Sequence, residues 1–404
     1  MKRVLFVDED AASIARLRGA FLQPDAPWDA VFVGSGEEAL AQLQTGHFDA
    51  IVSDMGMPRM DGAQLLATVR ERHPEVVRLC LSDAIDEEQL LRAVPVTHQF
   101  LRKPCNPEAV REVVERACSL ASILHDPAIR QLISRLHGLP ATPRTFQDLS
   151  AAIARPTAHT ADINQIVSND RALCVKTLQI VNSALYRRGA PITTISAAIN
   201  YVGLEMLKSL ALSACMFNAL DAAPATNRLL ADLQSRSLRK ARFAHALLEH
   251  QHGADEAFTA ALLLDVGEAV LALGAPAQFA RMIALARERG LPWHAVEPEC
   301  FGVAHPEVGA CLLGLWGLPL ELIEAVAHHH HPSAVAHAQT CVLAAVHVAD
   351  AVVDATADRP VRLLDYLDGA FVARGEVTRW LRGWNIDVGA GVAALQEPPA
   401  PEAP

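Results

Sequence analysis

In the first part of the chain, up to about residue 120, short apolar runs alternate with segments in which apolar residues recur at helical spacing. The apolar runs predict five strands, at residues 3–7, 29–33, 50–54, 77–82 and 98–103. Because these runs are apolar throughout, both faces of each strand should be covered. The pattern predicts an α/β fold, a doubly wound five-stranded parallel sheet with helices on both faces.

The pattern then changes, and no convincing strand follows. Helical spacing dominates and is interrupted at "LPATP", "RGAP" and "GLP", which predicts an all-α domain. Asn106 as a cap and Pro107 in the first turn predict the start of a connecting helix. The expected divisions are 1–121 for the α/β domain, 107–136 for the connecting helical segment, 127–396 for the all-α domain and 397–404 for a disordered tail.

Composition narrows the class of protein. Hydrophobic residues make up 51% of the 404 residues and charged residues 20%, which indicates buried cores. The formal net charge of −11 argues against direct DNA binding. One basic run stands out, and it is interpreted as a solvated helix face. It comprises Arg236, Arg239, Lys240 and Arg242.

Apolar segments and cysteine spacing predict where in the cell the protein is located. The apolar start of the chain is too short for a signal-peptide core, and no uncharged stretch approaches the ~20 residues that span a bilayer. The eight cysteines form no CxxC pair, which favours buried free thiols in a reducing compartment. We therefore expect a cytoplasmic protein that does not bind membranes.

Polar residues follow four of the predicted strands. The first strand runs into Asp8, Glu9 and Asp10, and the third ends at Asp54. Because ligands of such sheets bind where the strands end, these carboxylates should gather at one edge. An all-oxygen cluster suits Mg²⁺. With a hydroxyl from Ser82 and an ammonium from Lys103 after the last two strands, the edge is equipped for phosphoryl transfer to Asp54.

This region resembles the response-regulator receiver domains of two-component signalling, through "FVDED", "DAIVSDMGMPRMDG", "LCLS" and "QFLRKP". The resemblance implies that Asp54 accepts a phosphoryl group from a histidine kinase or a phosphotransfer protein. It implies a Mg²⁺ site, contacts to the phosphoryl oxygens and an aromatic switch, and homodimers are common in the family. The implied residues are Glu9, Asp54 and the Gly56 carbonyl for Mg²⁺, Asp8 through water, Ser82 and Lys103 for the phosphoryl oxygens, and Phe100 for the switch.

Histidines and aspartates in the helical part suggest a second site. Asp265, His305, one or two of the residues 328–331 and Asp350 are the raw material of a metal-dependent hydrolase. Since neighbouring helical residues point ~100° apart, at most two of the four consecutive histidines can face one site. The alternative interpretation makes Asp265 a packing acceptor and the histidines a polar cluster at a helix end.

The helical part resembles HDOD domains, the non-catalytic relatives of the HD phosphohydrolases, through "IVNSALY", "PITTISAAINYVG", "AALLLDVGEAVLAL", "AHPEVGACLLGLWGLP" and "AVAHHHHP". Against the catalytic pattern, Arg236 stands where the first metal-binding histidine would be and Leu264 replaces the histidine before Asp265. The positions that appear retained are Asp265, His305, His329 or His330, and Asp350.

The resemblance implies no metal in this domain and no enzymatic activity beyond the receiver's own phosphoryl group. The output would be phosphorylation-dependent binding of another signalling protein, such as a kinase or a cyclic-di-nucleotide enzyme. Two alternatives stay open. One is a receiver-regulated, metal-dependent HD phosphohydrolase that acts on a cyclic di-nucleotide or nucleotide. The other is a helical domain that binds a nucleotide through Arg236 and its basic neighbours without cleaving it.

Overall fold

The computed structural model describes residues 2–22, 28–82, 89, 92–104, 106–123, 152, 160–183, 189–203, 207, 224–248, 252–335, 340–356 and 366–372. They fall into two compact units. Unit 1 comprises residues 1–192, 197–220 and 311–319, and unit 2 comprises residues 193–196, 221–310 and 320–404. The predicted domain boundaries and the tail at 397–404 fall largely outside the described residues and stay predictions.

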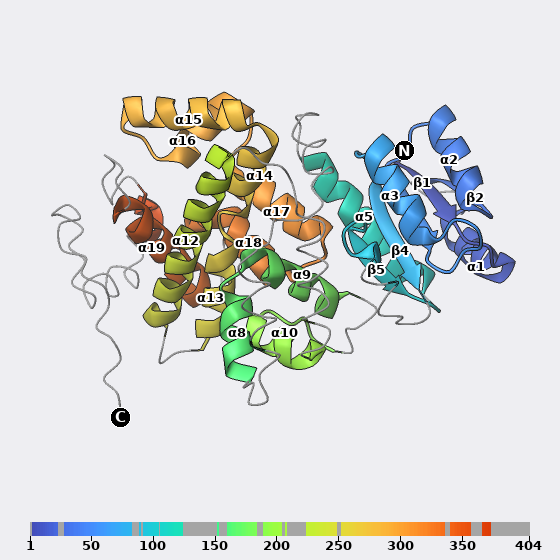
Figure 1. The fold of residues 1–404 in the computed structure, drawn as a ribbon, viewed down its shortest axis with the longest axis horizontal. Coiled ribbons are helices and arrows are strands. Elements are labelled where there is room, and N and C mark those ends of the chain that lie inside the picture. The colour runs from blue at the N-terminus through green and yellow to red at the C-terminus, as the bar shows by residue number, and fades with distance from the viewer. Residues whose placement is uncertain are drawn as a thin grey trace. The chain divides into compact units, whose positions relative to one another are not determined.

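A five-stranded parallel sheet forms the centre of the N-terminal part of unit 1 (Figure 1). Its order is β2-β1-β3-β4-β5, and every neighbouring pair is parallel. The predicted strands and the α/β class are confirmed. The strands are β1 (Lys2–Val7), β2 (Trp28–Val33), β3 (Ala50–Asp54), β4 (Val77–Ser82) and β5 (Gln99–Arg102).

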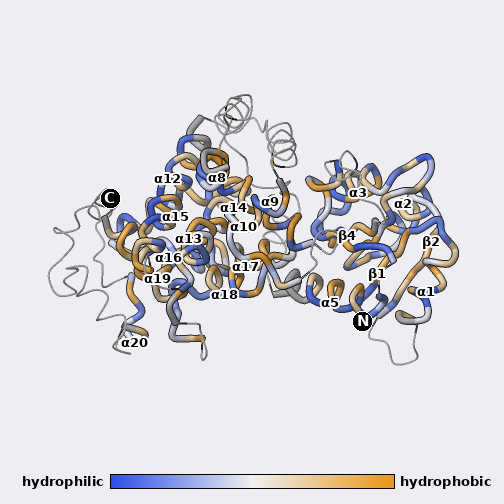
Figure 2. The backbone as a smooth tube through the Cα atoms, turned by 90° about the horizontal axis from the view of Figure 1, so that it is seen from below, coloured by the Kyte–Doolittle hydropathy of each residue, from blue (hydrophilic) through white to orange (hydrophobic). Residues whose placement is uncertain are grey.

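Helices cover the sheet in two pairs that pack together, α1 (Ala11–Phe21) with α5 (Pro107–Ile123), and α2 (Gly36–Thr45) with α3 (Gly62–Arg72). The residue before each of α1, α2 and α3 caps that helix with its side chain, as Asp10, Ser35 and Asp61 do. The tube of α5 alternates between hydrophobic and hydrophilic colour (Figure 2). Val110, Val114 and Ala117, at helical spacing on one side of α5, are fully buried.

Unit 1 also contains α8 (Thr160–Ser168), α9 (Arg171–Asn182) and residues 311–319. Two side chains of α9 meet backbone carbonyls next to β5. Gln179 Nε2 donates to the His98 carbonyl at 2.9 Å, and Lys176 Nζ donates to the Val94 carbonyl at 3.3 Å. Gln99, in β5 itself, donates to the Leu315 carbonyl at 3.0 Å. The side chains of Lys176, Gln179 and Gln99 therefore find hydrogen-bond acceptors within unit 1.

Unit 2 is helical in the described residues. Its helix α12 (Pro224–Leu247) packs along α13 (Ala254–Leu263) and α19 (Thr340–Thr356). No strand occurs among the described residues after 127, which confirms the all-α prediction for that part. The helices are α12 (Pro224–Leu247), α13 (Ala254–Leu263), α14 (Val266–Gly274), α15 (Pro276–Arg289), α16 (Trp293–Phe301), α17 (His305–Leu315), α18 (Leu320–His328), α19 (Thr340–Thr356) and α20 (Gly369–Val372); α10 (Ile195–Val202) and α17 each run across the division between the units, and a 3-10 turn, η1, spans Pro332–Ala334.

The stretch Ala254–Gly274 is long and apolar enough to cross a membrane by length and composition alone. Within its most apolar 18 residues, 83% are buried inside the protein. The stretch also contains the buried carboxylates of Asp265 and Glu268. Core helices of globular proteins meet the same criterion. Among the described cysteines, Cys80, Cys118, Cys174 and Cys311 are buried, as predicted, whereas Cys300 is half-buried, and none of the five forms a disulfide.

Candidate functional sites

The first candidate site lies at the carboxyl end of the sheet. Asp54 is the last residue of β3, Asp8 follows β1 and Lys103 follows β5. Lys103 Nζ lies 2.7 Å from Asp54 Oδ1 and 2.8 Å from Asp8 Oδ2. Since parallel strands end at one edge, residues separated by almost a hundred positions meet there. The structure therefore brings together three of the residues predicted for phosphoryl chemistry.

The other predicted residues of this site differ in their surroundings. Asp10 is a helix cap, because its carboxylate accepts from the backbone N–H groups of Ala12 and Ser13. Glu9 is exposed. Ser82 ends β4 and is 7% exposed. Phe100 is buried within β5, where it pairs with Cys80 of β4.

Two carboxylates share one ammonium at this edge. Burial raises the pKa of Asp54, although Lys103 opposes the shift. Burial also works against the charge of Lys103, but hydrogen bonds to Asp54 and Asp8 outweigh it and raise the pKa of that lysine. The surplus of negative charge and the oxygen donors fit a hard cation such as Mg²⁺. A small pocket opens beside them, lined by Asp8, Ser13, Arg16, Leu17, Leu81, Lys103 and Pro104.

Close backbone packing holds the Asp54 end of the strand. A Cβ atom on Gly62, the first residue of α3, would lie 2.2 Å from the Asp54 carbonyl oxygen. The Gly62 N–H donates to the Met55 carbonyl at 3.1 Å. Only glycine allows this approach, so the loop after Asp54 returns directly against the strand end.

The second candidate site is a buried charged cluster in unit 2, and it overturns one prediction. The basic run on α12 is not a solvated face. Arg239 and Arg242 are exposed, but Arg236 and Lys240 are buried, at 6% and 0% exposure. The reason is helical phase, because residues four apart lie on the same side of a helix.

Lys240 occupies the centre of this cluster. Its Nζ lies 2.7 Å from Asp265 Oδ2, 2.6 Å from Asp350 Oδ1 and 3.3 Å from Asp354 Oδ1. Burial opposes its charge, but the three carboxylates together raise the pKa of Lys240. The same pairing outweighs burial in the opposite direction at Asp265, whose pKa is lowered by Lys240 and Arg236.

Arg236 extends the same network to a further carboxylate. Its Nη2 lies 2.5 Å from Glu268 Oε2 and 3.4 Å from Asp265 Oδ2. Arg236 was predicted at the degenerate site, whereas Lys240, Glu268 and Asp354 were not. Helical spacing was the available signal, since each of these stands three or four residues after a recognised member. Leu264, 0% exposed and apolar, adds no ligand.

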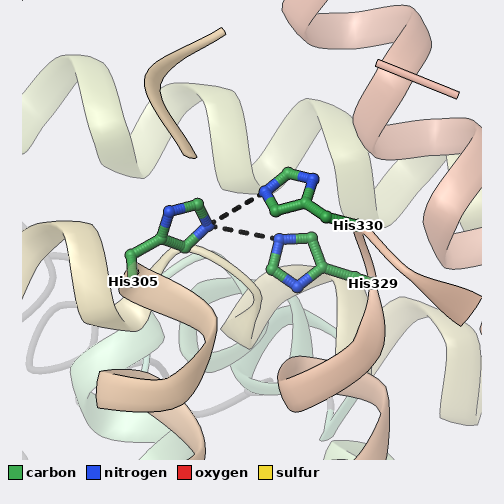
Figure 3. A group of neighbouring side chains, drawn as sticks. All are labelled: His305, His329 and His330. Carbon is green, nitrogen blue, oxygen red and sulfur yellow. Dashed lines mark hydrogen bonds between the residues drawn. The ribbon is translucent and has the colours of Figure 1, made fainter. Parts of the chain in front are cut away.

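Three histidines lie beside these carboxylates and point toward one another (Figure 3). His305 Nε2 lies 3.2 Å from His329 Nε2 and 3.3 Å from His330 Nε2. Two of the four consecutive histidines therefore reach the site, within the limit that helical geometry sets. His328 is half-buried and His331 is exposed.

Neighbouring charges set the proton affinities of these imidazoles. Burial disfavours a charged His305, but the Glu297 carboxylate, 2.8 Å from its Nδ1, raises the pKa of His305 to about 9. Burial lowers the pKa of His329 to about 4. The raised pKa favours the charged form of His305, whereas the lowered pKa favours the neutral form of His329.

Comparison with known proteins agrees with both architectures. A family model for the response regulator receiver domain matches residues 4–115, and one for the HDOD domain matches residues 139–332. The chain therefore belongs to the response regulators that carry an N-terminal receiver domain and a C-terminal HDOD domain.

Individual relatives are more distant. The chain is 26% identical over 248 residues to an uncharacterized protein of Treponema pallidum, covering 61% of this chain and 46% of that protein. It is 30% identical over 151 residues to the hydrogenase transcriptional regulatory protein HoxA of Cupriavidus necator, covering 37% of this chain and 31% of that protein. The chain thus spans less than half the length of these curated relatives.

A solved structure shares the fold. A virulence factor of Campylobacter jejuni aligns with a TM-score of 0.50 at 19% identity, over 65% of this chain and 92% of that one.

Proposed function

We propose that this response regulator accepts a phosphoryl group on Asp54 from a histidine kinase or a phosphotransfer protein. The observation that carries the proposal is the Lys103 ammonium bridging Asp54 and Asp8 at the end of the sheet. Lys103 holds the Asp54 carboxylate in place beside the pocket. It would then neutralise charge on the incoming phosphoryl oxygens.

Mg²⁺ would bind beside Asp54 and supply further neutralisation of phosphoryl charge. The residues that would hold it are Asp54, Glu9 and the Gly56 carbonyl, with Asp8 acting through water. The anionic surplus around Lys103 supports this assignment, as does the exposure of Glu9, which leaves its carboxylate available.

Phosphorylation would act as a population shift between two receiver states. The phosphoryl group adds about −1.5 to −2 charges next to Ser82 and Lys103. The Ser82 hydroxyl would then move toward the phosphoryl group. Phe100 would follow this movement, because it lies on the neighbouring strand β5, two residues before Arg102, which pairs with Ser82. Differential stabilisation of about 5.5 kcal/mol would convert a 1:99 ratio to 99:1.

The output would be protein binding rather than hydrolysis. Lys240 and Arg236 already neutralise the carboxylates that a two-metal hydrolase would use, which supports a non-catalytic HDOD domain over a phosphohydrolase. The partner would be another cytoplasmic signalling protein, such as a kinase or a cyclic-di-nucleotide enzyme. Its contact would depend on the phosphorylation state of Asp54, and the net charge of −11 supports a role without direct DNA binding.

The test is partner capture from a cell lysate with the full chain in two states, treated and untreated with Mg²⁺ and a small-molecule phosphodonor. We expect at least one partner to be enriched in only one state, and Asp54→Asn to abolish that difference. The matched control is Asp10→Asn, which changes a carboxylate at the same edge that serves as a helix cap. Identical partners in both states would contradict the switch.

A further inference from the structure

We propose that unit 2 binds one divalent transition-metal ion of the zinc type through the Nε2 atoms of His305, His329 and His330. The three side chains are 2%, 0% and 6% exposed, and they come from the start of α17 and the segment directly after α18. Their converging arrangement is visible in Figure 3.

The spacing of the three nitrogens suits a tetrahedral ion. A Zn–N bond of about 2.0–2.1 Å puts neighbouring tetrahedral nitrogens about 3.3 Å apart. His305 Nε2 lies 3.2 Å and 3.3 Å from the Nε2 atoms of His329 and His330. All three nitrogens lie within 4.8 Å of one another.

Two of the three histidines are held through their other ring nitrogen. Nδ1 of His305 lies 2.8 Å from the Glu297 carboxylate, and Nδ1 of His329 lies 2.8 Å from the Val326 carbonyl. Nδ1 of His330 lies 3.3 Å from Asp350 Oδ2 but makes no hydrogen bond to it. An Nδ1 that donates leaves Nε2 as an acceptor in neutral imidazole. A metal ion between the three Nε2 atoms would take the place of the second proton that His305 holds. Histidine ligands of metals show the same outward Nδ1 contacts as His305 and His329.

The charge of the surroundings favours a cation. Five buried carboxylates, those of Asp265, Glu268, Glu297, Asp350 and Asp354, lie in the cluster with only two permanent cations, Arg236 and Lys240. The three remaining negative charges must be balanced by protons or by a metal ion, because unbalanced charge is costly inside a protein.

This site differs from the two-metal arrangement whose loss was inferred from Leu264. Leu264 follows α13 directly and Lys240 binds the carboxylates around Asp265, whereas the three imidazoles require neither. The proposal therefore revises the expectation that unit 2 holds no metal, without making it a hydrolase. It is also independent of Asp54, which belongs to unit 1.

The experiment is a zinc titration of the full, unphosphorylated chain after chelator treatment, followed by calorimetry, with Co²⁺ absorption as a geometric readout. We expect one Zn²⁺ per chain and the intense visible bands of tetrahedral cobalt. His330→Gln should weaken zinc binding at least 100-fold. Glu297→Gln, which alters only the carboxylate that orients His305, should weaken it about 10–100-fold.

The matched control is His331→Gln, the neighbour of His330 with an exposed side chain. It should bind zinc as the unaltered protein does, and circular dichroism should show that both variants fold. If the unaltered chain takes up no stoichiometric zinc, the proposal is overturned. Equal losses in His330→Gln and His331→Gln would also overturn it, because they would assign the binding to the surface of the histidine run.

Discussion

Two lysines of this protein bridge carboxylates, and their surroundings set them apart. Lys103 joins Asp54 to Asp8 at the edge of the sheet and is 14% exposed. Lys240 joins three aspartates inside unit 2 and is 0% exposed. At the sheet edge, a small pocket lies beside Asp8 and Lys103. Among Asp265, Asp350 and Asp354, the Lys240 ammonium occupies the position that a metal ion bound by these carboxylates would need.

The comparison teaches that similar pairs of charges support different roles according to access. An ion pair near water can be rearranged at low cost, since water replaces the lost contacts. A fully buried pair cannot, because removing one partner leaves the other desolvated. We therefore expect changes at Asp54 to alter chemistry, and changes at Lys240 to alter stability.

The largest expected effect is that of Asp54→Asn on phosphorylation. The amide is not a nucleophile, so uptake from a small-molecule phosphodonor with Mg²⁺ should fall to background. Intact-protein mass spectrometry measures it. Asp10→Asn should still be phosphorylated, since an amide oxygen also caps a helix. Phosphorylation of Asp54→Asn equal to that of the unaltered chain would mean that another residue is the acceptor.

The next effect is that of Lys240→Met on the stability of unit 2. The substitution leaves Asp265, Asp350 and Asp354 buried without their shared ammonium, and breaking such a pair costs about 3–5 kcal/mol. Denaturant unfolding measures it. Arg239→Met, on the exposed side of the same helix, should change the free energy of unfolding by less than about 0.5 kcal/mol. Equal effects of the two substitutions would refute the central place of Lys240.

Two glycines allow a matched test of packing in the two regions. A Cβ on Gly62 would lie 2.2 Å from the Asp54 carbonyl oxygen, and one on Gly267 would lie 2.0 Å from the His305 carbonyl oxygen. Gly62→Ala and Gly267→Ala should each destabilise by about 1–3 kcal/mol through overpacking. Only Gly62→Ala should also slow phosphorylation.

Gly19 is the control for these substitutions, because a Cβ there would meet nothing within 4 Å. Gly19→Ala in the exposed part of α1 should raise stability by about 0.5–1 kcal/mol, since alanine favours the helix. A destabilised Gly19→Ala together with a neutral Gly267→Ala would contradict the packing described around His305.

The smallest effect concerns a third lysine, which lacks carboxylate partners among its described contacts. Burial lowers the pKa of Lys176 from 10.5 to about 8. Between these values the unfolded chain holds more protons than the folded one, so stability should rise with pH. The contribution from pH 7 to pH 9 is about 1 kcal/mol. Denaturation at both pH values measures it, and the rise should disappear in Lys176→Met. An unchanged pH slope in that variant would refute it.

Much of the fold and of the receiver site could be predicted from the sequence. The five strands were visible because parallel strands covered on both faces are apolar throughout. Asp8, Asp54 and Lys103 could be brought together because each stands at the end of a strand or directly after one, and parallel strands end at one edge. For these residues, the position at the end of a strand is enough to place them at the carboxyl edge of the sheet.

The cluster of unit 2 was predicted only in part. Asp265, His305 and Asp350 were recognised by residue type. Lys240 was predicted to lie on a solvent-exposed helix face, and Glu268, Glu297 and Asp354 were not predicted as site residues. Helical spacing tells which residues share a face, but it does not tell which face turns inward. For Lys240, that is decided by the packing of α12 against α13 and α19.

By itself, the sequence determined the order of strands and helices and the residues at the ends of the sheet, because those depend on local periodicity and on one rule of parallel sheets. Only the tertiary structure decided that Lys240 is buried among three aspartates and that His305 meets His329 and His330. These contacts depend on the rotation and packing of separate helices, which many side chains determine together and no short segment encodes.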